Sequence, residues 1–218
     1  MKYYPIYLDI RDKLCVVIGG GFVAERKVIS LLDAGARVTL VSPETTSSLN
    51  DMAIAGRIMF KKRPYQDGDL DGAFMAYAAT GDKDVNSLVV SEGRKKGVLC
   101  NVINAADMCD FIVPSVVERG DLLIAISTCG ASPAFAKRLR NELQERYGAE
   151  YAVFLDIMAA IRQKLLTKGF ENDKNRKIFN ELASSGIPSM IKDGRLEQVN
   201  DTLVAILGDD FTISSLGI

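Results

Sequence analysis

The fold is decided by the stretch L-C-V-V-I-G-G-G-F-V-A-E-R-K-V-I-S-L-L-D-A-G-A, which runs from Leu14 to Ala36. Its apolar, β-rich start ends at Gly19, and Gly19, Gly21 and Ala24 fit the G-x-G-x-x-A spacing of a dinucleotide-binding turn. Apolar residues at helical spacing follow, and residues 37–41 form a second β-rich run. Because strand, glycine turn, helix and strand come in this order, the pattern favours a nucleotide-binding half over an ordinary tight turn in an α/β domain.

Each small residue of this turn has a predicted role. Gly19 permits the tight turn, Gly21 lets backbone N–H groups approach a pyrophosphate, and Ala24 lets the helix pack close to the strand. The helix N-terminus adds a positive potential that favours an anion. Since backbone N–H groups make most of these contacts, the expected pyrophosphate-binding residues are Gly19, Gly20, Gly21, Phe22, Val23 and Ala24.

Length, composition and charge restrict the remaining function classes. The 218 residues suffice for one large domain or two small ones, and 48% hydrophobic residues are typical of a protein with a packed core. A net charge of −1 provides no basic field, so neither nucleic acid nor a membrane is an expected partner. No stretch has the pattern of a signal peptide or a membrane span, so we expect a cytoplasmic protein.

Histidine and tryptophan are missing from the sequence. Without histidine the chain lacks the commonest metal ligand and general base, which excludes a zinc site, a Ser-His-Asp triad and a Cys-His pair. We therefore expect no metal site. Of the four cysteines, Cys15 and Cys100 fall in apolar runs and are expected in the core rather than in a disulfide framework.

Further apolar runs extend the first strand–helix–strand unit. β-rich runs cover residues 58–63, 73–79 and 98–102, and a helix is predicted over residues 82–96, where Gly97 ends it. Strands that alternate with helices predict an α/β fold with a Rossmann-type, doubly wound parallel sheet.

The pattern changes after this sheet. Residues 111–117 and 122–127 are β-rich runs at hairpin spacing, and Ser132-Pro133 is a typical start for a helix that reaches about Tyr147. In the rest of the chain, glycine and proline residues such as those of Gly186-Ile187-Pro188 separate the predicted helices. Helices are predicted there over residues 152–168, 174–184 and 196–207.

Five segments in order carry a resemblance to a known family. They are Y-P-I-Y-L-D-I-R-D-K (Tyr4–Lys13), V-A-E-R-K after the glycines, A-A-T-G-D-K-D-V-N (Ala78–Asn86), C-N-V-I-N-A-A-D-M-C-D-F-I-V-P-S (Cys100–Ser115) and I-S-T-C-G-A-S-P-A-F-A-K-R-L-R (Ile126–Arg140). This set, which covers roughly residues 3–146, resembles the precorrin-2 dehydrogenase family, the N-terminal module of siroheme synthases.

The resemblance implies NAD-dependent oxidation of precorrin-2 to sirohydrochlorin, with NAD as the cofactor, and in some members insertion of ferrous iron to give siroheme. It also implies a homodimer with three parts. These are an NAD-binding Rossmann domain over residues 1–112, a small mixed dimerisation segment over 113–148 and a C-terminal helical domain over 149–218. From the length of the chain we expect no fused methyltransferase module.

Three further residues are expected to bind the cofactor. Pro43 and Glu44 follow the second strand and match the family's adenosine-ribose segment, while Thr80 follows a central strand and is a candidate for the nicotinamide ribose. The alternatives are that Glu44 only starts the next helix and that Thr80 is only a helix cap. No Arg or Lys immediately follows the second strand to meet a 2′-phosphate, which favours NAD over NADP.

Asn104 departs from the family pattern, which has at this position an aspartate regarded as the catalytic acid or base and linked to chelation. An amide does not titrate near neutral pH and is a poor metal ligand, so Asn104 is expected to position the macrocycle without acting as a base. We therefore expect oxidation to persist and chelation to be weak or absent. Asp107 and Asp110 are nearby sources of a carboxylate, although at least one of them is expected to be only a loop residue.

The family places the segment around Ser127, Thr128 and Ser132 beside the tetrapyrrole. Arg138, with its neighbours Lys137 and Arg140, is a candidate partner for the substrate's carboxylates, against a solvated helix face or a dimer contact. Arg26 and Lys27 are weaker candidates for the same carboxylates, with surface charges of the first helix as the alternative.

Two other functions are alternatives to the dehydrogenase. Asn104 favours a non-catalytic NAD-binding sensor of the same fold. The motifs after Cys100 favour the dehydrogenase instead, because a sensor has no need of a loop that faces a tetrapyrrole. A short-chain oxidoreductase predicts a Tyr-x-x-x-Lys pair, and the sequence contains none.

Overall fold

The computed structural model describes residues 1–167 and 172–218. It divides the chain into two compact units, Met1–Val113 and Pro114–Ile218. Among the described residues, no helix combines the length and the apolar composition that crossing a bilayer requires.

The first unit contains a five-stranded parallel sheet with the strand order β3-β2-β1-β4-β5. The sequence order reverses between β1 and β4, and ligands of such sheets bind at the carboxyl ends of the strands at this point. The expected α/β, Rossmann-type fold is confirmed. The strands are β1 (Leu14–Ile18), β2 (Arg37–Val41), β3 (Met59–Lys61), β4 (Met75–Ala78) and β5 (Leu99–Val102).

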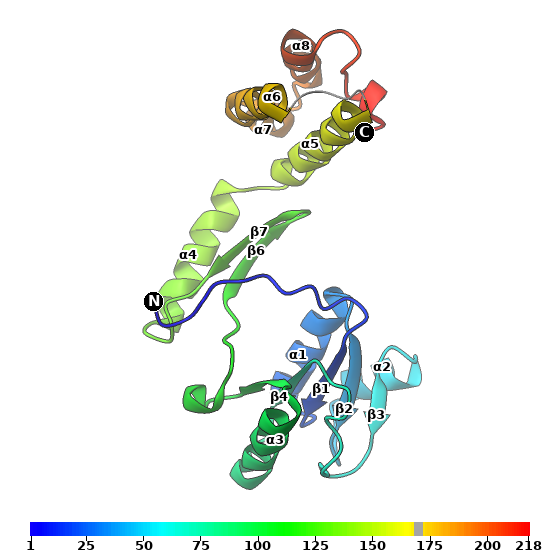
Figure 1. Cartoon of the computed structure of the whole chain (residues 1–218), viewed down its shortest axis with the longest axis vertical. Coiled ribbons are helices and arrows are strands. Elements are labelled where there is room, and N and C mark those ends of the chain that lie inside the picture. Colours follow the sequence, from blue (N-terminus) through cyan, green and yellow to red (C-terminus); the bar gives the residue numbers. More distant parts are fainter. Residues whose placement is uncertain (168–171) are drawn as a thin grey trace. The chain divides into compact units, whose positions relative to one another are not determined.

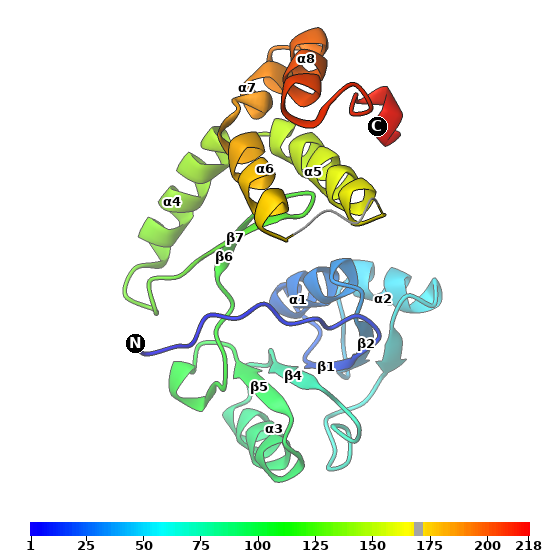
Figure 2. The same ribbon diagram turned by 45° about the horizontal axis from the view of Figure 1, so that its top comes forward.

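Helices cover both faces of this sheet. α1 (Phe22–Asp33) and α2 (Ser47–Ile54) lie on one face, and α3 (Lys83–Lys96) lies on the other (Figures 1 and 2). Each face has its own apolar core because successive strand residues point to opposite sides. Val17 of β1 packs on the α1 side, whereas its neighbour Val16 packs on the α3 side.

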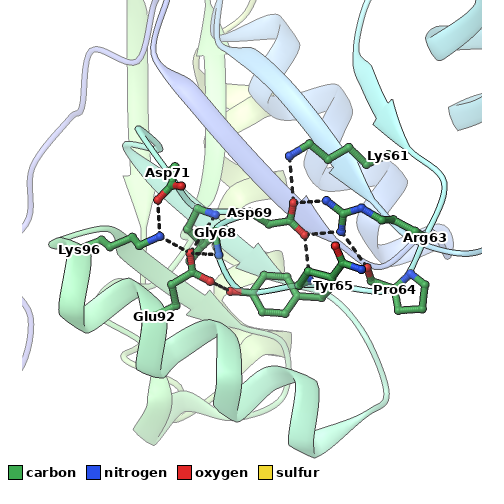
Figure 3. A network of polar contacts seen from close by, with 11 residues as sticks. Lys61, Arg63, Pro64, Tyr65, Gly68, Asp69, Asp71, Glu92 and Lys96 are labelled. Atoms are coloured by element: carbon green, nitrogen blue, oxygen red, sulfur yellow. Dashed lines mark hydrogen bonds and ion pairs between the residues drawn. The ribbon is translucent and has the colours of Figure 1, made fainter.

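Two buried carboxylates hold the long connection between β3 and β4 (Figure 3). Asp69 accepts hydrogen bonds from Lys61 and Arg63, with Nζ–Oδ1 and Nη2–Oδ1 distances of 2.9 and 2.6 Å. Burial opposes its ionised form, but the bonds from these cations outweigh burial and hold the pKa of Asp69 well below its usual value. Glu92 of α3 accepts from the hydroxyl of Tyr65, from Lys96 and from the backbone N–H groups of Gly68 and Leu70.

The second unit begins with an antiparallel hairpin, β6 (Ser115–Arg119) and β7 (Leu122–Ile126), against which α4 (Pro133–Arg146) packs. The hairpin was expected, but the predicted start of its first strand at residue 111 is wrong. Pro114 has no N–H for a ladder, and Phe111 packs edge-on against Tyr77 in the first unit, with 5.6 Å between ring centroids.

Four helices complete the second unit around one apolar core, which includes Ile157, Ile161, Leu182 and Leu203. The expected helices are present, although Lys168, the predicted end of the first one, lies outside the described residues. α7 was not expected because Gly186-Ile187-Pro188 was interpreted as a break, whereas proline is well suited to the first turn of a helix. The helices are α5 (Glu150–Thr167), α6 (Asn172–Ser184), α7 (Ile187–Lys192) and α8 (Leu196–Leu207).

Candidate functional site

The glycine turn after β1 is fixed by close backbone contacts. Gly19 has a φ of +108°, and a Cβ added there would lie 2.4 Å from the carbonyl oxygen of Ala79. A Cβ on Gly20 would lie 1.9 Å from the carbonyl oxygen of Glu44. The turn is therefore held between the segments that follow β2 and β4, and Gly20 has a steric role that the spacing pattern did not reveal.

Gly21, in contrast, faces open space. It is the N-cap of α1, no side chain caps this helix end, and an added Cβ would meet no atom within 4 Å. The first-turn N–H groups, from Phe22 to Ala24, therefore keep their capacity to bind an anion. Ala24 is fully buried, as close packing of the helix on the sheet requires. These features fit the pyrophosphate of a dinucleotide.

The segment after β2 is tied to the glycine turn. The N–H of Thr46 donates to the carbonyl of Gly20 at 3.0 Å, and its hydroxyl donates to the Glu25 carboxylate at 2.5 Å. Thr46 also caps α2, so the alternative that Glu44 starts this helix is wrong. Glu44 is instead exposed and lines a hollow of about 430 Å³. The lining residues are Pro43, Glu44, Thr45, Thr46, Ser47, Asn50, Phe60 and Lys62.

Lys62 is a basic side chain at this hollow that the sequence analysis missed. Lys62 does not directly follow the second strand of the sequence; it follows β3, the strand that pairs in parallel with β2. Parallel pairing brings the carboxyl ends of two strands together, and this was the signal that could have identified it.

Thr80 lies at the carboxyl end of the central strand β4. Its hydroxyl accepts from the N–H of Asp82 at 3.1 Å, and Asp82, not Thr80, is the N-cap of α3. The alternative that Thr80 is only a helix cap is therefore wrong. Asn86 donates to the Thr80 carbonyl at 3.2 Å, while its own buried Oδ1 has no partner among the described residues.

The loop after β5 presents Asn104 to solvent in a left-handed conformation, with a φ of +63°. Asparagine is one of the few side chains that tolerate this conformation well. Two side chains fasten this loop to the backbone of β5. Asp110 accepts a hydrogen bond from the N–H of Cys100 at 2.8 Å, and the thiol of Cys109 lies 3.1 Å from the N–H of Val102. Both aspartates are exposed, but Asp110 is engaged in holding the loop, whereas Asp107 lies on a short 3₁₀ turn.

A second hollow, of about 380 Å³, lies between α1 and this loop. Lys27 at its wall is half-buried, and burial, with a smaller contribution from the charge of Arg26, lowers the pKa of its ammonium group. The alternative of a surface charge is therefore wrong for Lys27, although Arg26 is exposed. The lining residues are Val23, Arg26, Lys27, Ser30, Ile103 and Asn104.

The remaining predicted residues belong to the second unit. The hydroxyls of Ser127 and Thr128 accept from the N–H groups of Cys129 and Ser132 at 3.0 and 3.1 Å. Ser132 caps α4, as expected. Arg138 pairs with Glu142 one turn along the exposed face of α4, with an Nε–Oε1 distance of 2.7 Å. Within residues 1–167 and 172–218 no three His, Cys, Asp or Glu side chains gather as a metal site.

A parallel sheet whose glycine turn leads to an uncapped helix end defines a dinucleotide-binding protein of the Rossmann type. The chain belongs to the family described as "Putative NAD(P)-binding", whose model matches residues 6–115. Residues 119–146 match a second family model, described as "Sirohaem biosynthesis protein central".

Individual relatives agree with the expected resemblance, which is confirmed. The chain is 36% identical over 208 residues to a siroheme synthase of Methylobacillus flagellatus, covering 95% of this chain and 44% of the relative. It is 34% identical over 212 residues to a siroheme synthase of Nitrosococcus oceani, covering 97% and 45%. The chain thus spans less than half the length of these relatives. A solved structure of SirC, a precorrin-2 dehydrogenase, matches with a TM-score of 0.78 and 25% identity, covering 94% of this chain and 98% of that one.

Proposed function

We propose that this protein oxidises precorrin-2 to sirohydrochlorin with NAD as the hydride acceptor. The observation that carries the proposal is the match to a precorrin-2 dehydrogenase over 98% of that protein, in a chain whose glycine turn leads to an uncapped helix end. Both units take part in this match, since it covers 94% of the present chain.

The cofactor is proposed to lie along the carboxyl edge of the sheet. Bound NAD supplies the hydride acceptor of the reaction. The N–H groups of Gly21, Phe22, Val23 and Ala24 bind its pyrophosphate, with Gly19 and Gly20 shaping the turn. Glu44 and Pro43 contact the adenosine ribose, and Thr80 contacts the nicotinamide ribose. The Glu44 carboxylate repels a 2′-phosphate, which favours NAD even though Lys62 lies at the same hollow.

Residues that contact the substrate are proposed in each unit by itself. Asn104 orients the macrocycle by hydrogen bonds, since it cannot serve as a base, and the exposed Asp107 is the candidate proton acceptor of the same loop. Ser127, Thr128, Ser132 and Arg138 contribute polar contacts to the tetrapyrrole. The Arg138–Glu142 pair is exposed and therefore weak, so exchange of Glu142 for a substrate carboxylate costs little.

Anaerobic turnover of freshly generated precorrin-2 with NAD tests this function. NADH formation together with the sirohydrochlorin spectrum is the expected result. NAD binding without turnover would favour the non-catalytic sensor. The amide at position 104 is the observation that supports this alternative, because it cannot act as a base. Asn104→Asp then separates a disabled enzyme from a sensor, because only the former gains turnover.

Iron insertion is proposed to be weak or absent because position 104 carries an amide. We expect Asn104→Asp to raise the rate of ferrous iron insertion into sirohydrochlorin about tenfold or more, since a carboxylate is a far better base and metal ligand. Asn104→Ala is the control for positioning. An oxidation rate equal to that of the parent would contradict the positioning role of Asn104.

A homodimer formed through the β6–β7 hairpin is also proposed. Val116 is 41% exposed on the face of the hairpin where it pairs with Ala125, and a two-stranded sheet leaves both edges unpaired. We expect sedimentation to give a dimer for the parent and a monomer for Val116→Asp, with Ser91→Asp on the exposed side of α3 as control. A monomeric parent would contradict the proposal.

A further inference from the structure

The hollow of about 380 Å³ beside α1 carries two cations and no carboxylate. Arg26 and Lys27 both line it, and within the described part of the chain no ion pair joins either side chain to an acidic residue. Surface lysines and arginines ordinarily keep full hydration, but a cation on the wall of a hollow has lost part of it. Such a group gains more from an anionic ligand than an exposed cation does.

Lys27 contacts an aromatic side chain of the sheet. Its Nζ lies 5.4 Å from the ring centroid of Tyr77, within the range of a cation–π contact. Tyr77 is 6% exposed and packs edge-on against Phe111. Burial raises the pKa of Tyr77 to about 12, so its phenol is neutral and does not compensate the ammonium. Burial also lowers the pKa of Lys27, which means that the folded protein disfavours its charged form.

The nearest acidic residue in sequence is already engaged elsewhere. Glu25 precedes this pair on α1, but its carboxylate accepts from the hydroxyl of Thr46 beside the glycine turn. Residues two apart on a helix do not face each other, so Glu25 is not positioned to neutralise Lys27. Asn104, which lines the opposite side of the hollow, adds an amide that donates hydrogen bonds and carries no charge.

We propose that this hollow is a carboxylate-binding subsite for the tetrapyrrole, in which Lys27 binds one carboxylate arm, Arg26 stands at the rim and the amide of Asn104 donates to the same group. The inference rests on the proposed function, because that function supplies a macrocycle with several carboxylate arms. It assigns Lys27 a role in substrate specificity, since an arm fixed at the hollow determines which edge of the macrocycle faces Asn104.

Binding of sirohydrochlorin, followed by its absorbance change, tests the subsite without turnover. The variant is Lys27→Met, which keeps an unbranched apolar stem against Tyr77 but removes the charge. Lys95→Met is the matched control because Lys95 is an exposed lysine of α3. We expect Lys27→Met to bind sirohydrochlorin about tenfold or more weakly, as for loss of a charge-assisted hydrogen bond, and Lys95→Met to bind like the parent.

Two further measurements distinguish the subsite from a structural role. The affinity for NAD is expected to stay within about twofold of the parent's in both variants. The thermal midpoint of Lys27→Met is expected to equal or exceed that of the parent, because the substitution removes a partly desolvated charge. Equal sirohydrochlorin affinity in Lys27→Met and Lys95→Met would overturn the subsite alone. A parent protein that binds NAD but not sirohydrochlorin would overturn the proposed function, and the subsite with it.

Discussion

At the scale of single residues, the adjacent glycines Gly20 and Gly21 differ in the space that surrounds their Cα atoms. Gly20 is confined by the carbonyl of Glu44, whereas Gly21 faces only space. The first is therefore a requirement of the folded protein, and the second is a requirement of the ligand that we propose for it.

Alanine at each position separates these requirements. Gly20→Ala is expected to lower the free energy of unfolding by about 1–3 kcal/mol, because the backbone must move to admit a methyl group. Gly21→Ala is expected to fold like the parent, since its φ of −82° suits alanine, but to bind NAD about tenfold or more weakly because the methyl group occupies the anion site. Urea unfolding and calorimetric NAD titration of both variants measure this, and unchanged NAD affinity in Gly21→Ala would contradict the assigned site.

The site was predictable from sequence where local geometry determines it. The positive φ of Gly19 and the helix cap Ser132 are properties of a few consecutive residues, and short patterns describe such positions well. Lys27 of α1 is half-buried and contacts Tyr77 of β4, which is far from it in the sequence. The apolar spacing of a helix does not predict such a contact. For the same reason Lys62 was missed at the hollow beside Glu44.

At the scale of elements, the connection between β3 and β4 depends on Asp69, whose side chain is 2% exposed and pairs with Lys61 and Arg63. Asp69→Asn is expected to lower the free energy of unfolding by about 1–2 kcal/mol at neutral pH, less than for a fully buried pair because both cations are about one-third exposed. Asp71→Asn, which affects a carboxylate that is 73% exposed, is the control and should unfold at nearly the parent's urea concentration.

The pH dependence of this effect has a definite sign. The folded state depresses the pKa of Asp69 below its ordinary value of 3.8, so its stabilisation is complete above that value and is lost as the pH falls through the folded-state pKa. The stability difference between the parent and Asp69→Asn should therefore shrink in acid. Urea unfolding at neutral pH and at about pH 3 measures it, and a difference that grows in acid would refute the assignment.

Which elements were predictable follows from their length and pattern. α1 and α3 have apolar residues at helical spacing, so both helices were predicted, and the predicted range of α3, residues 82–96, is close to the observed Lys83–Lys96. α2 and α7 are short, with 8 and 6 residues, and each places only one fully buried residue, Leu49 and Ile187, in the core. A single buried position gives no periodicity, so tertiary packing rather than local pattern determines these helices.

At the scale of the whole molecule, the unit Met1–Val113 contains a complete sheet and both of its apolar cores. A chain ending at residue 113 is therefore expected to fold and to bind NAD within about threefold of the full chain, but to form no NADH from precorrin-2. Circular dichroism, NAD titration and the turnover assay test this. Loss of NAD binding in a folded fragment would show that the second unit contributes to the cofactor site.

The loop that carries Asn104 has a consequence for how this family changes over time. Asp110 and Cys109 fasten the loop through backbone groups of β5, and the φ of +63° at position 104 is one that asparagine and aspartate both tolerate. A single codon change there exchanges an amide for an acid while leaving the scaffold as it was. If position 104 has the role that we propose for it, the capacity for metal insertion can change at this one residue without a change in the backbone contacts that hold the loop.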